Sequence, residues 1–420
     1  MSGAARRVAS YPAMRKIDAE RARQLAWLAM GLYIVALGIS ATFRNQGDFN
    51  VYYRAGHRVL HGLAVYPPAD NDRFLYAPIF AICFAPLAAM PRHLAQFFFF
   101  IINAFALVEF VRGAGVILFG RAQRLPALLI VLPVLLAFRF IGNNIEHGQI
   151  NLPTLALITW AIIYSDEDRP VWSGLMLAAA ILIKPFAILA ALHLALWRRF
   201  GALGWSIVAG IALLILPVVV FGPHGLIDQT SAYVSAVTSM TNRYRTMITN
   251  QSAVAAIARI VSRAGSIDAE TSATPALVGT GLELALVIAV SLWDWTSRHR
   301  EGFAGRLALC GMFCLMPSLM PISWKSYYAA LLLPYMALGA ALWRGREHGR
   351  ETNLAVAMPF ALSVLLNLAP GNYLSRVAMF YSAHFISSLL ALAALFTLWL
   401  QTGRSGGVAK TGADLAAIPA

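Results

Sequence analysis

The sequence predicts an all-α membrane protein, a polytopic helical bundle with about 12 crossings and interfacial helices in its first external loop. Of the 420 residues, 59% are hydrophobic and only 12% are charged, whereas soluble domains carry about 25% charged residues. The mean hydropathy is +0.66. The charges lie in short clusters between apolar runs, and a run of roughly 20 apolar residues spans a bilayer. These observations exclude a soluble enzyme, a disordered scaffold and a secreted disulfide framework.

The charge balance fits the same class of protein. Lys and Arg number 33 against 19 Asp and Glu, a net charge of +14, which in a soluble protein would indicate nucleic acid. In a polytopic membrane protein, basic residues gather in cytoplasmic loops, and we expect no nucleic-acid partner. The cysteines Cys83, Cys310 and Cys314 lie in apolar segments without metal-ligand spacing, so we expect them to pack as small apolar side chains.

The chain divides into a basic cytoplasmic leader over residues 1–24, a transmembrane domain over residues 25–401 and a tail over residues 402–420 that we expect to be disordered. The leader is basic and has no cleavage-site pattern, which indicates a retained first helix. The clearest crossings are residues 25–43, 203–221, 275–295, 303–321, 327–343, 354–368 and 378–400. Four shorter crossings are expected between residues 126 and 200, broken at 147–149, 165–169 and 184–185.

Basic clusters at 197–199, 298–300 and 344–346 predict cytoplasmic loops. Both termini then lie in the cytoplasm, and loops 44–73, 222–250 and 370–376 and the turn at 323–326 lie outside. We expect a bacterial inner membrane with the active face toward the periplasm or exterior. Segments 75–90 and 94–111 look like two crossings, yet Arg121 and Arg124 require an odd number. Either one segment is re-entrant or lies on the surface, or that basic loop is external.

Polar residues gather in five clusters on the predicted outer face, at 47–78, 146–151, 183–185, 242–252 and 321–328. Each has a structural alternative: Asp48 as a helix N-cap, Lys184 as a snorkelling lysine, and the aromatics near residue 324 as an interface belt. Together they offer a carboxylate, several cations and aromatic rings. That set suits a lipid-linked phosphate and a sugar, because cations hold the phosphate and a carboxylate can take a proton from a hydroxyl.

At these residues the sequence resembles glycosyltransferase family 87, polytopic GT-C enzymes that use polyprenyl-phosphate sugars. The motifs run in order as Gly47-Asp48-Phe49-x-Val51-Tyr52-Tyr53, Tyr66…Phe74-x-Tyr76-x-Pro78, Gly148-Gln149-x-Asn151, Gly174…Ile183-Lys184-Pro185, Asn250-Gln251-Ser252 and Ser323-Trp324. The resemblance implies a GT-C bundle with its active site at the outer boundary. It also implies inverting transfer of a sugar to a lipid or glycan acceptor. Mannose is the family's commonest sugar, and arabinose or another sugar stays open.

The resemblance further implies that Asp48 is the catalytic base and that no metal or cofactor is needed, so that cations stabilise the departing phosphate. By position on the outer face, the phosphate-binding candidates are His147, Lys184, Arg243, Arg245 and Lys325. The candidates for sugar or acceptor contacts are Tyr52, Tyr53, Tyr76, Gln149, Asn151, Asn250, Gln251 and Trp324. Family members often carry a histidine just after Ser-Trp, where this chain continues with Lys325-Ser326-Tyr327-Tyr328. Lys325 would replace it as a point charge.

Two other classes of function fit parts of the pattern. A transporter or lipid flippase for envelope precursors would favour repeated halves and broken helices near the midplane, and we see no clear internal repeat. A non-catalytic assembly subunit for envelope polysaccharide predicts that Asp48 is dispensable, since Asn or Ser would cap a helix equally well. No residue indicates the acceptor or the oligomeric state.

Overall fold

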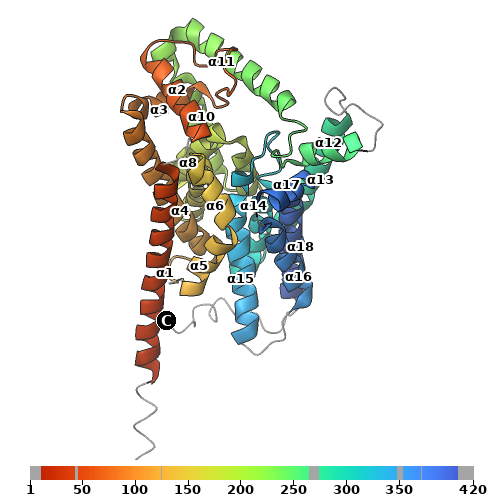
Figure 1. Ribbon diagram of the computed structural model, residues 1–420. Coiled ribbons are helices and arrows are strands. Elements are labelled where there is room, and N and C mark those ends of the chain that lie inside the picture. Colours follow the sequence, from red (N-terminus) through yellow and green to blue (C-terminus); the bar gives the residue numbers. More distant parts are fainter. Residues whose placement is uncertain are drawn as a thin grey trace, which may run out of the picture.

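The computed structural model describes residues 11–42, 46–123, 125–263, 274–347, 353–369 and 371–404. Within these ranges the regular elements are all helical (Figure 1), which confirms the predicted all-α membrane bundle. Five segments are long and apolar enough to cross a membrane by length and composition, or up to seven if each of two bent helix pairs is one span. Five further apolar helices have 10 to 17 residues. The count of about 12 crossings stays a prediction.

The long spans lie in α1 (Tyr11–Thr42), α4 (Arg92–Phe119), α13 (Thr274–Ser297), η2 with α15 (Lys325–Leu331 and Leu332–Glu347) and α18 (Ala383–Arg404). The bent pairs are α5 with α6 (Ala127–Leu136 and Phe138–Glu146, 65°) and α10 with α11 (Phe200–Ile215 and Val218–Arg243, 84°). The shorter apolar helices are α3 (Pro78–Ala88), α8 (Pro170–Ile183), η1 with α9 (Pro185–Ala187 and Ile188–Leu196), α14 (Gly302–Leu315) and α16 (Leu354–Asn367). The other helices are α2 (Gly47–Leu60), α7 (Asn151–Asp166), α12 (Ala253–Arg263) and α17 (Gly371–Phe380).

The expected breaks at 147–149, 165–169 and 184–185 are confirmed, because α6, α7, α8 and η1 meet at these points. Three predicted crossings were too long. The 203–221 crossing ends with α10 at Ile215, where Pro217 starts the bend, and most of the expected loop 222–250 is helix α11. Segment 303–321 leaves the helix at Leu315, just before Pro317. Segment 378–400 is interrupted by Ser382, whose φ is 58°.

The structure also bears on the leader, the tail and the number of crossings before residue 124. Helix α1 begins at Tyr11, so residues 11–24 continue the first span, and α18 runs to Arg404, while residues 405–420 lie outside the described residues. Helix α3 has 11 residues, too few to cross the hydrocarbon core alone, whereas α4 has 28. This difference favours a surface-lying or re-entrant α3. Cys310 and Cys314 are buried as expected, but Cys83 on α3 is exposed.

Burial separates the centre of the bundle from its rim. The η2–α15 span is 83% buried inside the protein, whereas the spans in α1 and α13 are 17% buried. Since apolar side chains are stable in hydrocarbon, α1 and α13 face lipid along much of their length, and η2–α15 lies in the core. The segment that follows Ser323-Trp324 therefore runs through the protein interior.

A second apolar cluster lies at one end of the bundle, where Figure 1 places α2, α3 and α11; we call this the α2 end. It consists largely of aromatic rings. Tyr52 stacks edge-on against Tyr76 and Phe80 with ring centroids 5.1 and 5.2 Å apart, and Phe49 packs on Phe84 at 5.8 Å. Such ring pairs stabilise packing beyond their buried area. They fix α2, which carries Asp48, against α3.

Candidate active site

Asp48 lies in the first turn of α2 and is not its N-cap. The N-cap is Gln46, which makes no side-chain cap hydrogen bond. The amides of Asp48 and Phe49 instead donate to the carbonyl oxygen of His147, at 3.2 and 3.4 Å. The N-cap interpretation of Asp48 is therefore wrong. The carboxylate is half-buried and sits where the helix dipole favours negative charge.

Gln149 holds one oxygen of this carboxylate. Its Nε2 donates to Oδ2 of Asp48 at 2.6 Å. Its Oε1 accepts from Asn151 Nδ2 at 2.7 Å and from Ser326 Oγ. Because two donors engage the amide oxygen, the amide nitrogen must face Asp48. Oδ1 of Asp48 accepts no hydrogen bond from the described residues, so one carboxylate oxygen is fixed and the other is open.

Gly148 lets the 147–150 turn come close to α2. Its φ is +64°, and a Cβ built on it would lie 2.6 Å from Cβ of Phe49 and 3.0 Å from Oε1 of Gln46. Any other residue would combine a strained backbone with a clash against α2. The glycine of the Gly148-Gln149-x-Asn151 motif thus brings Gln149 to Asp48.

Lys184 is the buried cation of the cluster. It follows α8 at the break before Pro185 and is 5% exposed. Its Nζ donates to the hydroxyl of Tyr327 and lies 4.2 Å from the ring centroid of Tyr327 and 4.8 Å from that of Tyr76. This cation–π contact holds the ammonium inside the protein, so the lysine does not snorkel to an interface.

The environment moves the acidity of Asp48 in two directions. Burial raises the pKa of Asp48 above its ordinary value, whereas the hydrogen bond from Gln149 and the charges of Lys184 and His147 lower it. The negative charge of Asp72 adds to the rise. Burial is the largest of these effects, and a carboxylate with a raised pKa is a stronger base.

The predicted aromatic contacts have different surroundings. Tyr52 and Tyr76 share a hydrogen bond of 2.7 Å between their hydroxyls and are only 1% and 8% exposed. Both rings pack in the interior next to Lys184, so little of their surface is exposed for contact with a sugar. Tyr53 donates to the carbonyl of Met90 at 2.8 Å, away from the cluster. Trp324 is half-buried and packs on Tyr244, with ring centroids 5.3 Å apart.

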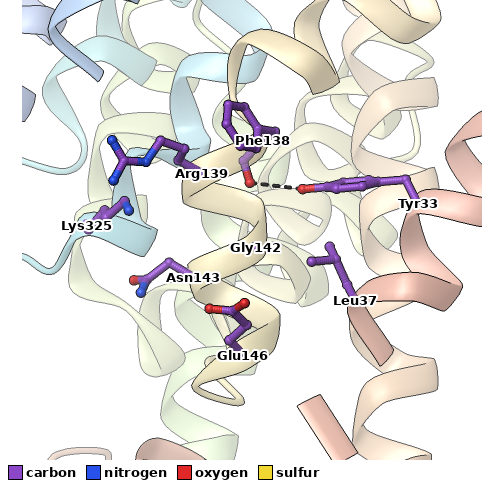
Figure 2. A pocket seen from close by; sticks show the side chains of 8 residues that line it. All are labelled: Tyr33, Leu37, Phe138, Arg139, Gly142, Asn143, Glu146 and Lys325. Carbon is purple, nitrogen blue, oxygen red and sulfur yellow. Dashed lines mark hydrogen bonds between the residues drawn. The ribbon is translucent and has the colours of Figure 1, made fainter. Parts of the chain in front are cut away.

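The remaining predicted cations lie in three different places. His147 is exposed and contributes its carbonyl to α2. Arg243 donates to the carbonyl of Asn71 at 3.2 Å, and Arg245 to Oδ1 of Asn242 at 2.9 Å. Arg243 is the last residue of α11, and Arg245 follows that helix. Lys325 is not brought to Asp48. It lines a separate cavity of about 280 Å³ beside α6 (Figure 2).

Asn250 and Gln251 are buried and bonded to the backbone. Asn250 Nδ2 donates to Pro321 O at 2.9 Å, and its Oδ1 accepts from Ser323 N at 3.0 Å. Gln251 Nε2 donates to Met379 O at 2.7 Å. These bonds tie the 244–252 segment to the segment before η2 and to the α17–α18 turn. The structure thus places both amides as supports of the site.

Ser326 and Tyr327 were assigned no role from the sequence. They follow Lys325 in η2, a 3₁₀ helix with three residues per turn, so consecutive side chains point in three directions. Ser326 reaches Gln149, Tyr327 reaches Lys184 and Lys325 faces the cavity. The three directions follow from the 3₁₀ geometry of η2, and the sequence of an apolar segment does not reveal that geometry.

Among the described residues, no group of three or more His, Cys, Asp or Glu side chains is arranged to hold a metal ion. The expectation that no cofactor is needed stays a prediction.

A helical membrane bundle that places a partly buried carboxylate beside a buried lysine at one end has the parts of a membrane enzyme. Comparison with known proteins defines the enzyme class. The profile of glycosyltransferase family 87 matches residues 74–321, more than half of the chain, and the chain belongs to this family. It is a membrane glycosyltransferase, which confirms the resemblance and argues against the transporter and the assembly subunit. The matched stretch includes Gln149, Asn151 and Lys184 but not Asp48.

The chain is also similar to the polyprenol-phosphate-mannose-dependent alpha-(1-2)-phosphatidylinositol pentamannoside mannosyltransferase of Mycobacterium tuberculosis (strain CDC 1551 / Oshkosh). The two are 24% identical over 341 residues, which cover 78% of this chain and 74% of that protein.

Proposed function

We propose that this protein transfers mannose from a polyprenyl-phosphate donor to a hydroxyl group of a lipid or glycan acceptor, with inversion at the anomeric carbon and Asp48 as general base. The observation that carries the proposal is the half-bound carboxylate, with Oδ2 held by Gln149 and Oδ1 open, beside the charge of Lys184. The dependence of the mycobacterial relative on polyprenol-phosphate-mannose supports the donor class.

In this mechanism Oδ1 of Asp48 takes the proton of the acceptor hydroxyl. The acceptor oxygen forms a bond to C1 of the sugar from the face opposite the phosphate. The bond between C1 and the phosphate oxygen breaks, and its electron pair stays on the polyprenyl phosphate. Burial, which raises the pKa of Asp48, makes the carboxylate a better proton acceptor. Gln149, Asn151 and Ser326 then position the base and do not contact the sugar.

Lys184 supplies the positive charge for the leaving phosphate. One of its three N–H donors is engaged by Tyr327, which leaves donors for an anion. A fixed cation at a developing charge contributes about 3–4 kcal/mol in a water-poor site. Because a lysine and a tyrosine hydroxyl supply this stabilisation, we propose that transfer needs no metal or cofactor and proceeds in EDTA.

The exposed and half-buried residues near the end of α11 would contact the sugar and the acceptor. Arg243 ends α11 and Arg245 follows it. The rings of Trp324 and Tyr244 are half-buried, and the charge of Asp72 acts on both Asp48 and Tyr244. We propose that the α2 end faces the periplasm or exterior of an inner membrane, as the basic loops predict.

The test is a transfer assay with the full chain reconstituted in vesicles. Labelled polyprenyl phosphates of mannose, arabinose and glucose are offered with a membrane-lipid acceptor extract, and the anomeric configuration of the product is read by NMR. We expect transfer from the mannose donor and a configuration opposite to that of the donor. Retained configuration would contradict Asp48 as a base in a single displacement, and a preference for another sugar would contradict mannose.

A further inference from the structure

A second cationic site lies apart from Asp48, in the cavity of about 280 Å³ between α1 and α6. Figure 2 shows Arg139 and Lys325 on one side of α6, and Tyr33 and Leu37, from α1, on the other. Asn143 and Glu146 complete its polar lining. The cavity thus combines two cations, one carboxylate and an apolar wall.

This cavity is distinct from the proposed catalytic cluster. In η2, Ser326 turns toward Gln149 and Tyr327 toward Lys184, whereas Lys325 turns toward the cavity. The charges that shift the pKa of Asp48 belong to Lys184, His147 and Asp72, and none of these residues lines the cavity. A phosphate held here would therefore not be the one that leaves the sugar next to Asp48.

Neither cation forms an ion pair within the described residues, and the carboxylate that acts on Lys325 is that of Glu146. Arg139 donates to Asn367 O at 3.0 Å, to Ala369 O at 2.5 Å and to Ser375 Oγ at 3.3 Å. These acceptors are neutral and fix the position of the guanidinium. In the part of the chain that the structure describes, no carboxylate forms an ion pair with Arg139 or Lys325. Unpaired cations within a membrane bundle are costly and indicate a ligand of opposite charge.

The position of the cavity indicates which class of anion binds there. Its α1 wall belongs to a helix whose residues Leu32 and Val35 are exposed along the lipid-facing side. The anions of a bilayer are the phosphodiesters of its lipids, and clustered cationic side chains bind phosphate oxygens through charge-assisted hydrogen bonds. The volume lies just below the usual range of about 300–1,000 Å³ for ligand pockets, which suits a head group. Among the described lining residues, the cations Arg139 and Lys325 outnumber the one carboxylate, Glu146.

We propose that this cavity binds the phosphodiester of an anionic membrane phospholipid, of the phosphatidylglycerol type. Arg139 and Lys325 hold the phosphate, and an acyl chain lies along the outer side of α1. The bound lipid joins α1 to α6, whose last residue Glu146 precedes the turn that carries Gln149. The proposal does not depend on the transfer reaction, because it concerns binding and stability.

The test uses the purified full chain, stripped of lipid in detergent, titrated with phosphatidylglycerol or phosphatidylcholine while Tm and lipid adducts in native mass spectrometry are followed. Phosphatidylglycerol should raise Tm saturably and bind more tightly than phosphatidylcholine. Lys325→Gln should weaken its binding roughly tenfold or more, the effect of losing one charge-assisted contact. The control Arg376→Gln removes an exposed charge on α17 and should leave binding unchanged.

A second variant tests the cavity without changing a charge. A Cβ on Gly142 would meet Leu37 at 3.6 Å and the Tyr33 hydroxyl at 3.8 Å, which are ordinary contacts. Gly142→Ala therefore fits, while Gly142→Leu extends into the cavity and should abolish lipid binding in a folded protein. Equal binding of the two lipids, equal loss in Lys325→Gln and Arg376→Gln, or lipid binding that survives Gly142→Leu would each overturn the proposal.

Discussion

Two buried polar networks in this bundle look alike in composition and differ in what they leave open. The Asp48 network consists of Asp48, Gln149, Asn151 and Ser326. The Asn367 network joins Tyr335, Ser363, Asn367, His384 and Ser387 across α15, α16 and α18. In the second, Asn367 Nδ2 donates to Ser387 Oγ at 2.6 Å and to Tyr335 Oη at 3.0 Å, and its Oδ1 pairs with His384 Nδ1 at 2.8 Å.

The difference shows how to separate a site from a structural network in a membrane protein. The Asn367 network has no carboxylate or lysine, and its hydroxyl and amide groups bond to one another, as expected for polar groups that join helices. Its open atom is Nε2 of His384, which is buried without a hydrogen-bond partner among the described residues. The Asp48 network ends on a carboxylate oxygen without a partner among the described residues, beside a lysine that makes one hydrogen bond. The carboxylate of Asp48 and the neighbouring lysine, more than burial or an unpaired polar atom, distinguish the reactive network.

The largest effect on transfer that tests this comparison is expected at Lys184. Lys184→Met removes the charge next to Asp48 and keeps an unbranched side chain in the buried position. Because the loss of one charge of a buried pair is destabilising, Tm is measured first to show that the variant is folded. We expect transfer to fall about 10²–10³-fold, as for loss of one fixed group that stabilises transition-state charge. Steady-state transfer in vesicles measures it. Arg245→Gln, outside the cluster, should cost less than tenfold; an equal loss in both variants would contradict the assignment.

Gln149→Met tests the positioning of the base. It removes the donor to Oδ2 of Asp48 and leaves the carboxylate free to turn. We expect kcat to fall about 10–10²-fold, the effect of misplacing a reacting group by about 1 Å, with KM little changed. Ser326→Ala, which removes only one of the two donors to Gln149, should lower kcat less. A rise in KM at constant kcat would instead show that Gln149 contacts substrate.

The pH profile gives a smaller but more specific signal. Asp48 must be ionised to take a proton, and burial raises its pKa above 3.8. Transfer should therefore rise with pH and level off once Asp48 is ionised, with a midpoint above 3.8. The hydrogen bond from Gln149 lowers this pKa, so Gln149→Met should move the midpoint to higher pH. An unchanged midpoint would contradict the prediction that Gln149 lowers the pKa of Asp48.

The Asn367 network should affect stability and leave transfer unchanged. Asn367→Leu keeps the volume and removes the hydrogen bonds to Ser387, Tyr335 and His384. We expect a loss of about 1 kcal/mol in the free energy of unfolding, typical of polar contacts between membrane helices, visible as a lower Tm. Transfer at a temperature where the variant is folded should match the wild type. A loss of transfer as large as that of Gln149→Met would contradict the prediction that the Asn367 network affects only stability.

The sequence predicted the bundle and the main breaks, because apolar runs and proline or glycine interruptions are local signals. The basic clusters predicted a topology that places Asp48, Gln149 and Lys184 on one face, and the resemblance implied the role of Asp48. The sequence misplaced Lys325, because the direction of a side chain in η2 depends on three residues per turn. It took Asn250 and Gln251 as substrate contacts, since a buried amide bonded to backbone and an exposed amide look the same in a sequence. Oδ1 of Asp48 has no hydrogen-bond donor among the described residues, and this too depends on the fold and cannot be read from the sequence.

The most direct test compares Asp48→Asn with Asp72→Asn in the reconstituted transfer assay. Asparagine keeps the shape of each side chain and cannot take a proton, and Asp72 is an exposed carboxylate whose charge acts on Asp48. We predict a loss of at least about 100-fold for Asp48→Asn, the scale of general-base removal, and a loss of less than tenfold for Asp72→Asn. Equal transfer by Asp48→Asn and wild type would remove Asp48 from the mechanism.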